Sequence, residues 1–360
     1  MTLIIDGHLD LAWNALAWNR DLRLSVATIR TQESTTLGLN RGLNTVCLPE
    51  LRQGRVMLCF ATLLARNSGT AEPHLDYLSP AQAYGAARGQ LAYYRALEQT
   101  GHVRVIEDRA ALDAHVALWQ MWETAGAPPT AAPPLGVIVT MESADPILDP
   151  ADLVNWHTAG VRLIGPAHYG AGRYAGGTRT ELGLTAQGSA LLAEMQRLGV
   201  ILDLTHCTDQ AFWQALDVYD GPVIASHNNC RAIVPQQRQF TDDQLKAVIV
   251  RDGVIGASFD AIMVRPGWNY GAATNPRVVI ADVVDHIDRV CQLAGTSAHA
   301  AIGSDLDGGF GREQSPADLD SIADLQRVPA LLAARGYTAT DIDSIMYGNW
   351  LRLLRRCWGA

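Results

Sequence analysis

Short runs of apolar and mostly β-branched residues recur along the chain, and most are separated by stretches with the apolar spacing of helices. Eight of these runs predict strands, near residues 3–7, 56–65, 135–142, 161–168, 200–206, 222–227, 254–259 and 300–305. Their nearly continuous apolar character is typical of strands that are buried on both faces.

The stretches between the runs carry helix start and stop signals, with a capping residue before and a glycine after. The pairs are Ser79 and Gly101, Thr185 and Gly199, and Thr241 and Gly253. Eight strands that alternate with helices predict an α/β fold, a (β/α)8 TIM-like barrel. A doubly wound open sheet is the alternative.

The connection between the second and third predicted strands is long, and we read it as an insertion around residues 66–134. It holds two helical stretches and a Pro/Ala segment, residues 127–134, that predicts a loop. The last fifty or so residues predict extra C-terminal helices packed against the barrel. With no internal repeat in view, we predict one barrel domain over residues 1–360.

The composition narrows the class of protein. The chain is 48% hydrophobic and 18% charged, as in ordinary globular proteins, and barrels of 360 residues occur as single domains. A formal net charge of −9 argues against nucleic acid and anionic membrane surfaces as partners. The six cysteines are widely spaced, and we see neither an apolar run of membrane length nor a signal peptide. These features predict a cytoplasmic location with reduced thiols.

Residues that can bind metals or move protons follow most of the predicted strands. His8 and Asp10 come after the first run, and side chains two residues apart on an extended segment point to the same side. The others are Glu142, His168, His206, His227 and Asp305, with Asp307 just beyond. Because the carboxyl ends of barrel strands converge on one face, and buried charge is costly without a partner, this pattern predicts a metal site.

The chemistry of these side chains suits two divalent ions. Imidazole nitrogen and carboxylate oxygen are ligands of Zn²⁺, and one carboxylate can bridge two metals about 3.5 Å apart. Some barrel hydrolases use a carboxylated lysine as this bridge. The single lysine, Lys246, falls in a predicted helix, so Glu142 is the expected bridge.

The chain carries, in order, the short motifs DGHLDL, MESAD, HYGAGRYAGGT, LDLTH, VIASHNNCRAI, IGSDLDGG and YGNWLRLLR. Together they resemble the renal (membrane) dipeptidase family of the amidohydrolase superfamily, over nearly the whole chain. The resemblance implies a binuclear zinc dipeptidase that hydrolyses small dipeptides with a free C-terminal carboxylate.

The resemblance also implies a role for each residue. His8 and Asp10 would hold one zinc ion, His206 and His227 the other, and Glu142 would bridge them. His168 would stabilise the oxyanion, Arg231 would pair with the substrate carboxylate, and Asp305 would carry the proton from water to the leaving amine. Asp305 is preferred to Asp307 because it directly follows the apolar AAIGS.

Two departures from the family pattern bear on the substrate. Ser143-Ala144-Asp145 stands where a Gly-rich stretch is usual, and Asp260 stands where the mammalian enzymes have an aromatic residue that touches substrate. A carboxylate facing the cavity at position 260 would attract an amino group or a basic side chain. A salt bridge to Arg265 or another loop arginine is the alternative. The mammalian membrane anchor and intersubunit disulfide have no visible counterpart, and a homodimer is left open.

Other interpretations stay open. The same barrel supports a deaminase, lactonase or phosphotriesterase activity, or a non-catalytic binding protein. A carboxylate-binding Arg231 favours a dipeptide over a neutral ester, and the complete set of metal ligands favours an enzyme. Away from the strand ends we expect a loop at His74–Asp76, a mobile loop at the site mouth over residues 170–177, and packing roles for Trp13 and Cys207.

Overall fold

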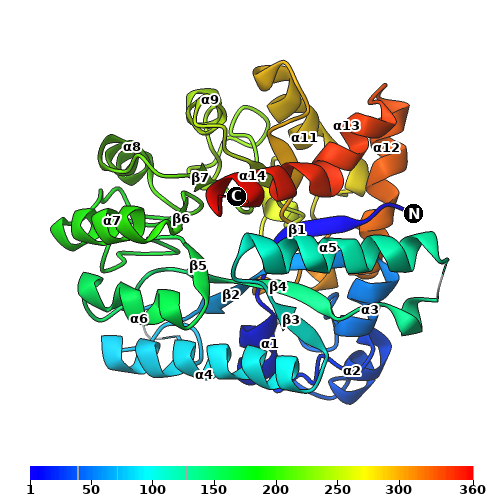
Figure 1. Cartoon of the computed structure of the whole chain (residues 1–360), viewed down its shortest axis with the longest axis horizontal. Helices are drawn as coiled ribbons and strands as arrows, with labels where there is room; N and C mark the ends of the chain where they lie inside the picture. The colour runs from blue at the N-terminus through cyan, green and yellow to red at the C-terminus, as the bar shows by residue number, and fades with distance from the viewer. Residues whose placement is uncertain (39, 71, 127, 360) are drawn as a thin grey trace.

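The computed structural model describes residues 1–360 except 39, 71, 127 and 360. Eight parallel strands follow one another in the order β7-β6-β5-β4-β2-β1-β9-β8, with a ninth strand beside β4. A bridge between Ala225 and Ile255 joins the two ends of this order, so the sheet forms a nearly closed barrel (Figure 1). The predicted (β/α)8 architecture is confirmed, and the open-sheet alternative is wrong.

Each of the eight predicted runs overlaps a barrel strand, with β1 extending two residues beyond its run, and the strand residues are almost all buried, as their apolar character predicts. The strands are β1 (Ile4–Leu9), β2 (Val56–Leu64), β3 (Val103–Val105), β4 (Leu135–Glu142), β5 (Val161–Ile164), β6 (Ile201–Asp203), β7 (Val223–Ile224), β8 (Ile255–Ala257) and β9 (Ala300–Ile302). The strands from β5 onward are short, and the polar residues predicted to carry chemistry follow them in loops.

The strand β3 is the element that the apolar pattern does not predict. It pairs with the first residues of β4, from Val103 opposite Leu135 onward, whereas β5 pairs with β4 further along, from Val139. Both strands therefore use the same edge of β4 at different heights. β3 extends the sheet within the insertion and takes no part in barrel closure.

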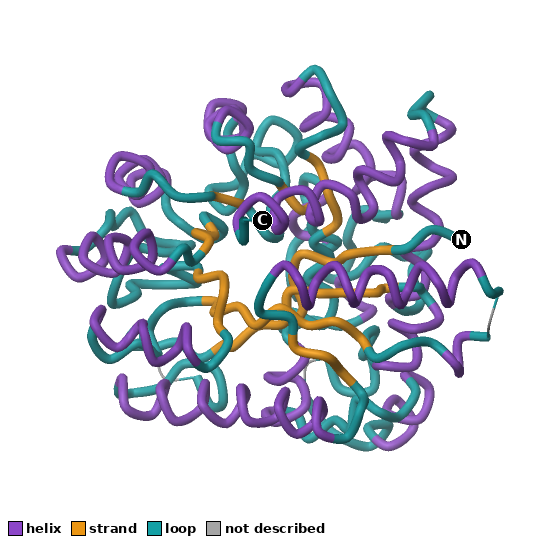
Figure 2. Tube along the Cα trace, in the orientation of Figure 1, coloured by secondary structure: helices purple, strands orange, loops and turns teal. Residues whose placement is uncertain are grey.

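Helices surround the strands (Figure 2). They are α1 (Leu11–Ala17), α2 (Val26–Gln32), α3 (Leu48–Gln53), α4 (Pro80–Gln99), α5 (Arg109–Thr124), α6 (Leu153–Thr158), α7 (Ala186–Leu198), α8 (Asp209–Val218), α9 (Asp242–Val250), α10 (Ala261–Val264), α11 (Ile280–Ala294), α12 (Val328–Ala334), α13 (Ala339–Asp343) and α14 (Asn349–Cys357). The predicted caps are in place: Ser79, Thr185 and Thr241 each accept a hydrogen bond from the backbone N–H three residues on.

The insertion between β2 and β4 holds α4, β3 and α5. The Pro/Ala segment contains a 3-10 turn at Pro129–Ala131, and Ala127 of the predicted loop lies outside the described residues. No helix in the described part of the chain is long and apolar enough to cross a lipid bilayer.

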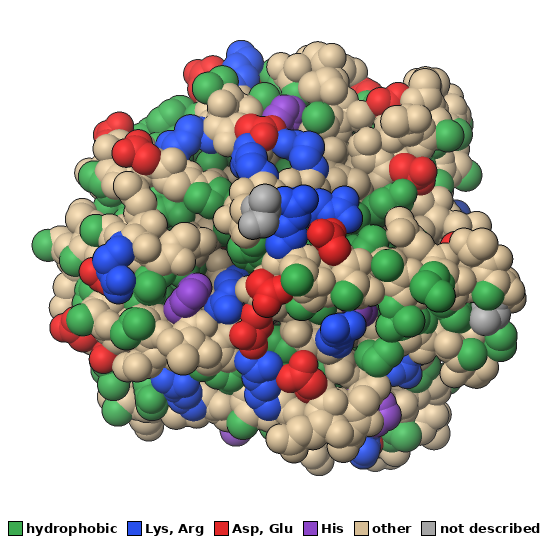
Figure 3. Space-filling model, in the orientation of Figure 1, with side chains coloured by type: hydrophobic (Ala, Val, Ile, Leu, Met, Phe, Trp, Pro, Cys, Tyr) green, Lys and Arg blue, Asp and Glu red, His purple; other side chains and the backbone are tan. Residues whose placement is uncertain are grey.

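The C-terminal helix α14 closes the end of the barrel at which the strands begin. Its Trp350 is buried beside Phe60, and the indole N–H donates to the carbonyl oxygen of Ile302 at 2.9 Å. A Cβ at Gly7 would lie 2.6 Å from the Trp350 ring, so this close approach of β1 requires glycine. On its outer side, Arg352 and Arg356 of α14 pair with Asp252. Basic and acidic side chains lie close together on this face of the molecule (Figure 3). The opposite end of the barrel is left for the polar residues.

Candidate active site

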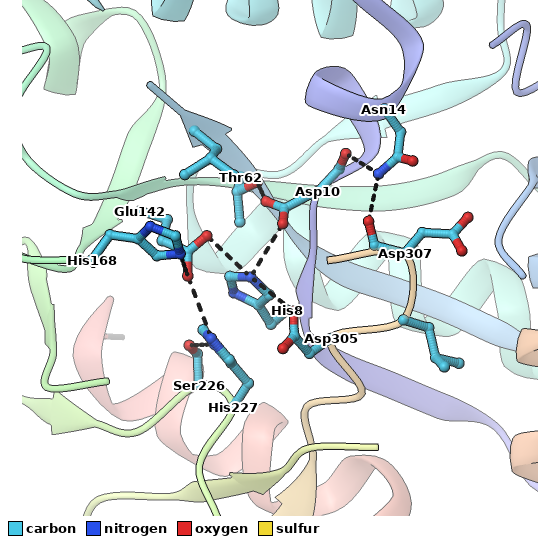
Figure 4. A network of polar contacts seen from close by, with 12 residues as sticks. His8, Asp10, Asn14, Thr62, Glu142, His168, Ser226, His227, Asp305 and Asp307 are labelled. Carbon is cyan, nitrogen blue, oxygen red and sulfur yellow. Dashed lines mark hydrogen bonds and ion pairs between the residues drawn. The ribbon is translucent and has the colours of Figure 1, made fainter. Parts of the chain in front are cut away.

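The polar residues that follow the strands meet around one carboxylate, that of Glu142 at the end of β4 (Figure 4). Its Oε1 lies 3.2 Å from Nε2 of His206, 3.3 Å from Nε2 of His227 and 3.7 Å from Nε2 of His168. Its Oε2 lies 3.5 Å from Nε2 of His8. Four imidazoles from β1 and from the loops after β5, β6 and β7 therefore face a single buried carboxylate.

Two further carboxylates approach His8 from the other side. Its Nε2 lies 3.9 Å from Oδ2 of Asp10 and 3.9 Å from Oδ1 of Asp305. The side chain of Thr62 donates a hydrogen bond to Asp10 and fixes its orientation. Three groups of these residues bring their ligand atoms within 4.8 Å of one another: His8, Glu142 and His227; Glu142, His168 and His206; and His8, Asp10 and Asp305.

The second nitrogen of each ring shows which imidazoles can bind a metal. Nδ1 of His206 lies 2.9 Å from the hydroxyl of Thr178, and Nδ1 of His227 lies 2.9 Å from the hydroxyl of Ser226. A hydroxyl can accept a hydrogen bond from Nδ1–H, which leaves the Nε2 lone pair free toward Glu142. Both rings therefore present Nε2 as an acceptor toward the centre of the site, which fits a metal ion.

The ring of His168 has a different neighbour. Nη1 of Arg66 lies 3.2 Å from its Nδ1, and a guanidinium can only donate. Nδ1 must therefore accept, and the proton of the neutral ring stays on Nε2. This tautomer makes His168 a hydrogen-bond donor toward the centre of the site.

Burial shifts the acidity of the whole cluster. It lowers the pKa of His206 and His227 well below the usual value, with Arg238 adding to the effect, so both rings are neutral. Burial and nearby Asp10 raise the pKa of Glu142. Burial opposes the charged form of His8, yet Glu142 and Asp10 raise its pKa well above the usual value. A divalent cation among the crowded carboxylates would take the place of the proton on His8, and carboxylates with imidazoles form the donor set that such a cation prefers.

One atom of the cluster tests the fit of a metal directly. Nε2 of His8 is buried and has no hydrogen-bond partner among the described residues, although three carboxylates surround it. Unpaired buried polar atoms are costly, and metal coordination would satisfy this one. His8, Asp10, Glu142, His206 and His227 therefore fit a metal centre.

A small cavity opens beside the cluster. Its walls include predicted residues, Asp260 among them, and others that the strand-end pattern did not indicate: Trp13, Leu64, Leu75, Tyr169, Arg238, Met263, Gly308 and Gly309. Trp13 was expected only to pack, and Leu75 belongs to the predicted loop at His74–Asp76. That loop is present, and the carbonyl oxygen of His74 accepts from the Trp13 indole at 2.8 Å. The cavity wall therefore joins α1 to the start of the insertion.

The structure does not bring Arg231 to this cavity, which corrects the prediction for that residue. Its guanidinium binds both carboxylate oxygens of Asp209, at 2.6 and 2.7 Å, and points toward α8. Arg238 lines the cavity instead. Its Nη1 donates to Oδ1 of Asn228 at 2.6 Å and its Nη2 to the carbonyl oxygen of His227 at 2.9 Å.

Residues 170–177, expected as a mobile loop, are tied to their surroundings. Bridges join Ala171 to Gly176 and Gly177 to Cys207, which packs inward as expected. The carboxylate of Asp145 accepts from the backbone N–H of Arg173 and of Asn67, both at 2.8 Å. Asp145 thus fastens this segment to the start of the insertion.

The family model of the membrane dipeptidases (peptidase family M19) matches residues 1–357. The chain belongs to this family. The resemblance seen in the sequence is confirmed, and membership of the dipeptidase family makes the chain a hydrolase.

Relatives of this family member vary in length. A protein encoded 5′ of pqqA in Klebsiella pneumoniae, of uncharacterised function, is 34% identical over 215 residues, which are 58% of this chain and 76% of that protein. The dipeptidase tcpJ of Claviceps purpurea is 31% identical over 207 residues, 56% of this chain and 45% of that protein. The alignments with several curated relatives span about half of their length.

Solved structures of the family share the fold. The crystal structure of the dipeptidase AC, a metallo peptidase of family M19, matches with a TM-score of 0.79 and 23% identity over 100% of this chain and 99% of that one. A metallo peptidase from Rhodobacter sphaeroides, liganded with a phosphinate mimic of the dipeptide L-Ala-D-Ala, matches with a TM-score of 0.78 and 23% identity over 99% of this chain and 100% of that one. This chain therefore has the same barrel fold as these two M19 peptidases.

Proposed function

We propose that this chain is a binuclear zinc dipeptidase that hydrolyses the peptide bond of small dipeptides with a free C-terminal carboxylate. The observation that carries the proposal is the Glu142 carboxylate with the Nε2 atoms of four histidines around it. Support also comes from the Rhodobacter sphaeroides neighbour, whose ligand is a phosphinate dipeptide mimic. A phosphinate has the tetrahedral shape of a carbonyl under attack by water.

Each ion has a set of ligands in this proposal. His8 and Asp10 would hold one ion, His206 and His227 would hold the other, and Glu142 would bridge them. Zinc bound there supplies Lewis acidity and an acidified water.

The remaining residues act on the substrate. The Nε2–H of His168 donates to the scissile carbonyl oxygen as negative charge develops on it, an interaction that is stronger in the transition state than in the ground state. Asp305 accepts the proton of the attacking water and delivers it to the leaving amine nitrogen. Arg238, held by Asn228 and the backbone of His227, pairs with the substrate carboxylate.

A substrate panel tests the proposal. Protein purified without chelator should hydrolyse dipeptides, and it should cleave the corresponding C-terminal amides much more slowly because Arg238 then has no anion to bind. Faster turnover of a lactone, a phosphotriester or an aminated ring would favour another amidohydrolase activity. Absence of turnover despite full metal content would favour a binding protein.

A cytoplasmic location and a homodimer are also proposals. All six cysteines are free thiols and five of them are buried, which supports a reducing compartment. Cell fractionation tests the location, and sedimentation analysis of the purified chain tests the dimer.

A further inference from the structure

We propose that Asp260 forms a cation subsite in the active-site cavity and selects substrates through an alkylammonium group. This inference rests on the proposed dipeptidase function and deepens it, because it names the charge that a preferred substrate carries. The two sources of an alkylammonium in a dipeptide are its free amino terminus and a lysine-type side chain.

The position of Asp260 follows from the barrel. It lies after β8 and caps the short helix α10, and its side chain lines the cavity that also contains Arg238 and Asp305. Asp260 is only 7% exposed, so its carboxylate is nearly removed from bulk water. A ligand that fills the cavity must meet this carboxylate.

The contacts of Asp260 leave its carboxylate without a direct ion-pair partner, although Arg238 in the same cavity favours its charged form. Oδ1 accepts from the backbone N–H of Ile262 at 3.1 Å and from Nε2 of Gln314 at 2.8 Å, and both donors are neutral. No cationic side chain of the described residues lies within 4.0 Å of it. Arg265, the alternative partner considered from the sequence, lies 3.7 Å from Asp282 instead.

Because Asp260 has no ion-pair partner among the described residues, its carboxylate is suited to bind a cationic group of a ligand. A buried carboxylate without a cation is costly, and burial raises the pKa of Asp260 to about 6. A metal ion is a poor candidate here, because Asp260 joins none of the groups of potential metal ligands among the described residues. An ammonium needs only one carboxylate and forms a charge-assisted hydrogen bond with it. Arg238 and Asp260 together then recognise opposite charges of one substrate.

The test compares substrates that differ only in charge. Ala-Lys against Ala-norleucine removes the side-chain ammonium, and Ala-norleucine against propanoyl-norleucine removes the N-terminal ammonium. Each pair is measured with the wild type and with Asp260→Asn, whose amide oxygen retains both hydrogen bonds of Oδ1. The matched control is Asp149→Asn, because Asp149 is exposed and accepts from Ala151 N–H in the same way, at 2.9 Å.

In the wild type, we expect kcat/KM to be at least about tenfold higher for the cationic member of one pair, and that pair identifies the source of the ammonium. The ratio should fall close to one in Asp260→Asn and stay unchanged in Asp149→Asn. A wild type without preference in either pair, or equal losses on charged and uncharged substrates in Asp260→Asn, would overturn the subsite.

A failure of the proposed dipeptidase function can be distinguished from a failure of the subsite, because in the first case no dipeptide is hydrolysed at all. Calorimetric binding of Ala-Lys, Ala-norleucine and propanoyl-norleucine to wild type and Asp260→Asn would in that case still decide the subsite. Tighter binding of a cationic ligand that depends on Asp260 supports it, and equal binding overturns it.

Discussion

The carboxylates of Asp305 and Asp307, two residues apart, lie on opposite sides of the turn that follows β9 (Figure 4). Both residues have positive φ, 59° and 63°, so the chain turns sharply between them. Asp305 lines the cavity with Oδ1 3.9 Å from Nε2 of His8. Asp307 accepts from the backbone N–H groups of Thr45 and Val46, at 2.7 and 3.0 Å, and fastens the segment before α3.

This separation predicts different consequences for the two Asp→Asn variants. Asp305→Asn should lower kcat by roughly 10²–10⁴-fold, the range for loss of a general acid–base group, with metal content and Tm retained. Asp307→Asn should leave kcat within a few-fold and lower the free energy of unfolding by about 1–3 kcal/mol, because an amide donor would face the Thr45 or Val46 N–H. Steady-state kinetics and denaturant unfolding measure the two effects. If Asp307→Asn abolishes turnover with fold and metals intact, the assignment of Asp305 is wrong.

Metal content is the next expectation. Elemental analysis of protein never exposed to chelator should find about two divalent ions per chain, and His206→Ala should lose at least one of them. Chelation should abolish turnover and lower Tm, because a ligand that binds only the folded state stabilises it. Cys207→Ala is the control: this neighbour is buried and is not a ligand, so the metal content should not change. Full activity with one ion or none would contradict the binuclear centre.

Arg238 and Arg231 provide a test and a matched control for binding of the substrate carboxylate. Arg238→Met should lower kcat/KM for dipeptides by about 10–100-fold, since a hydrogen bond to a charged group contributes about 1.5–3 kcal/mol. Arg231→Met removes an ion pair with Asp209 outside the cavity and should leave kcat/KM nearly unchanged. A C-terminal amide should already lack the interaction, so Arg238→Met should affect it little. Equal losses on the acid and the amide would show that Arg238 is structural.

The contact between Arg66 and His168 predicts a spectroscopic result. In the wild type, the ¹⁵N shifts of His168 should show the proton on Nε2, because Nδ1 accepts from Arg66. Arg66→Met should mix the tautomers and lower kcat by about tenfold or more with little change in KM, and Arg66→Lys should restore part of the loss. An unchanged Nε2 tautomer in Arg66→Met would rule out this positioning role.

The parts of the site that the sequence predicted depend on local signals. His8, Glu142 and Asp305 each belong to or follow an apolar run, and the barrel brings the ends of such runs together. Arg238 stands within the loop after β7, and its place in the cavity depends on hydrogen bonds to Asn228 and to the His227 backbone. No local pattern marks such contacts, and the resemblance pointed instead to Arg231, four residues after His227.

The same limit applies to β3 and to the cavity wall. β3 is three residues long with a half-buried Arg104 at its centre, and it is a strand because β4 pairs with it. Leu75 lines the cavity because the insertion folds back over α1. Both features depend on contacts between segments distant in sequence, whereas the helix caps, which depend on neighbours three residues away, were predicted correctly.

The raised pKa of Asp260 predicts that the preference for cationic substrates depends on pH. Burial raises the pKa of Asp260 from an ordinary carboxylate value to about 6, with Arg238 opposing the rise and Glu313 adding to it. Asp260 is therefore ionised above about pH 6 and neutral below it, whereas a lysine-type ammonium stays charged throughout and a free amino terminus stays mostly charged up to about pH 7.5. The preference for the cationic member of the selective substrate pair should be full near pH 7.5 and should decline as the pH falls through about 6. The ratio of the two kcat/KM values at each pH is the right measure, because titrations of the metal ligands and of Asp305 affect both substrates and cancel. Asp260→Asn should give a ratio near one at every pH. A wild-type ratio that stays constant between about pH 5 and 8 would show that the charge of Asp260 does not set the preference.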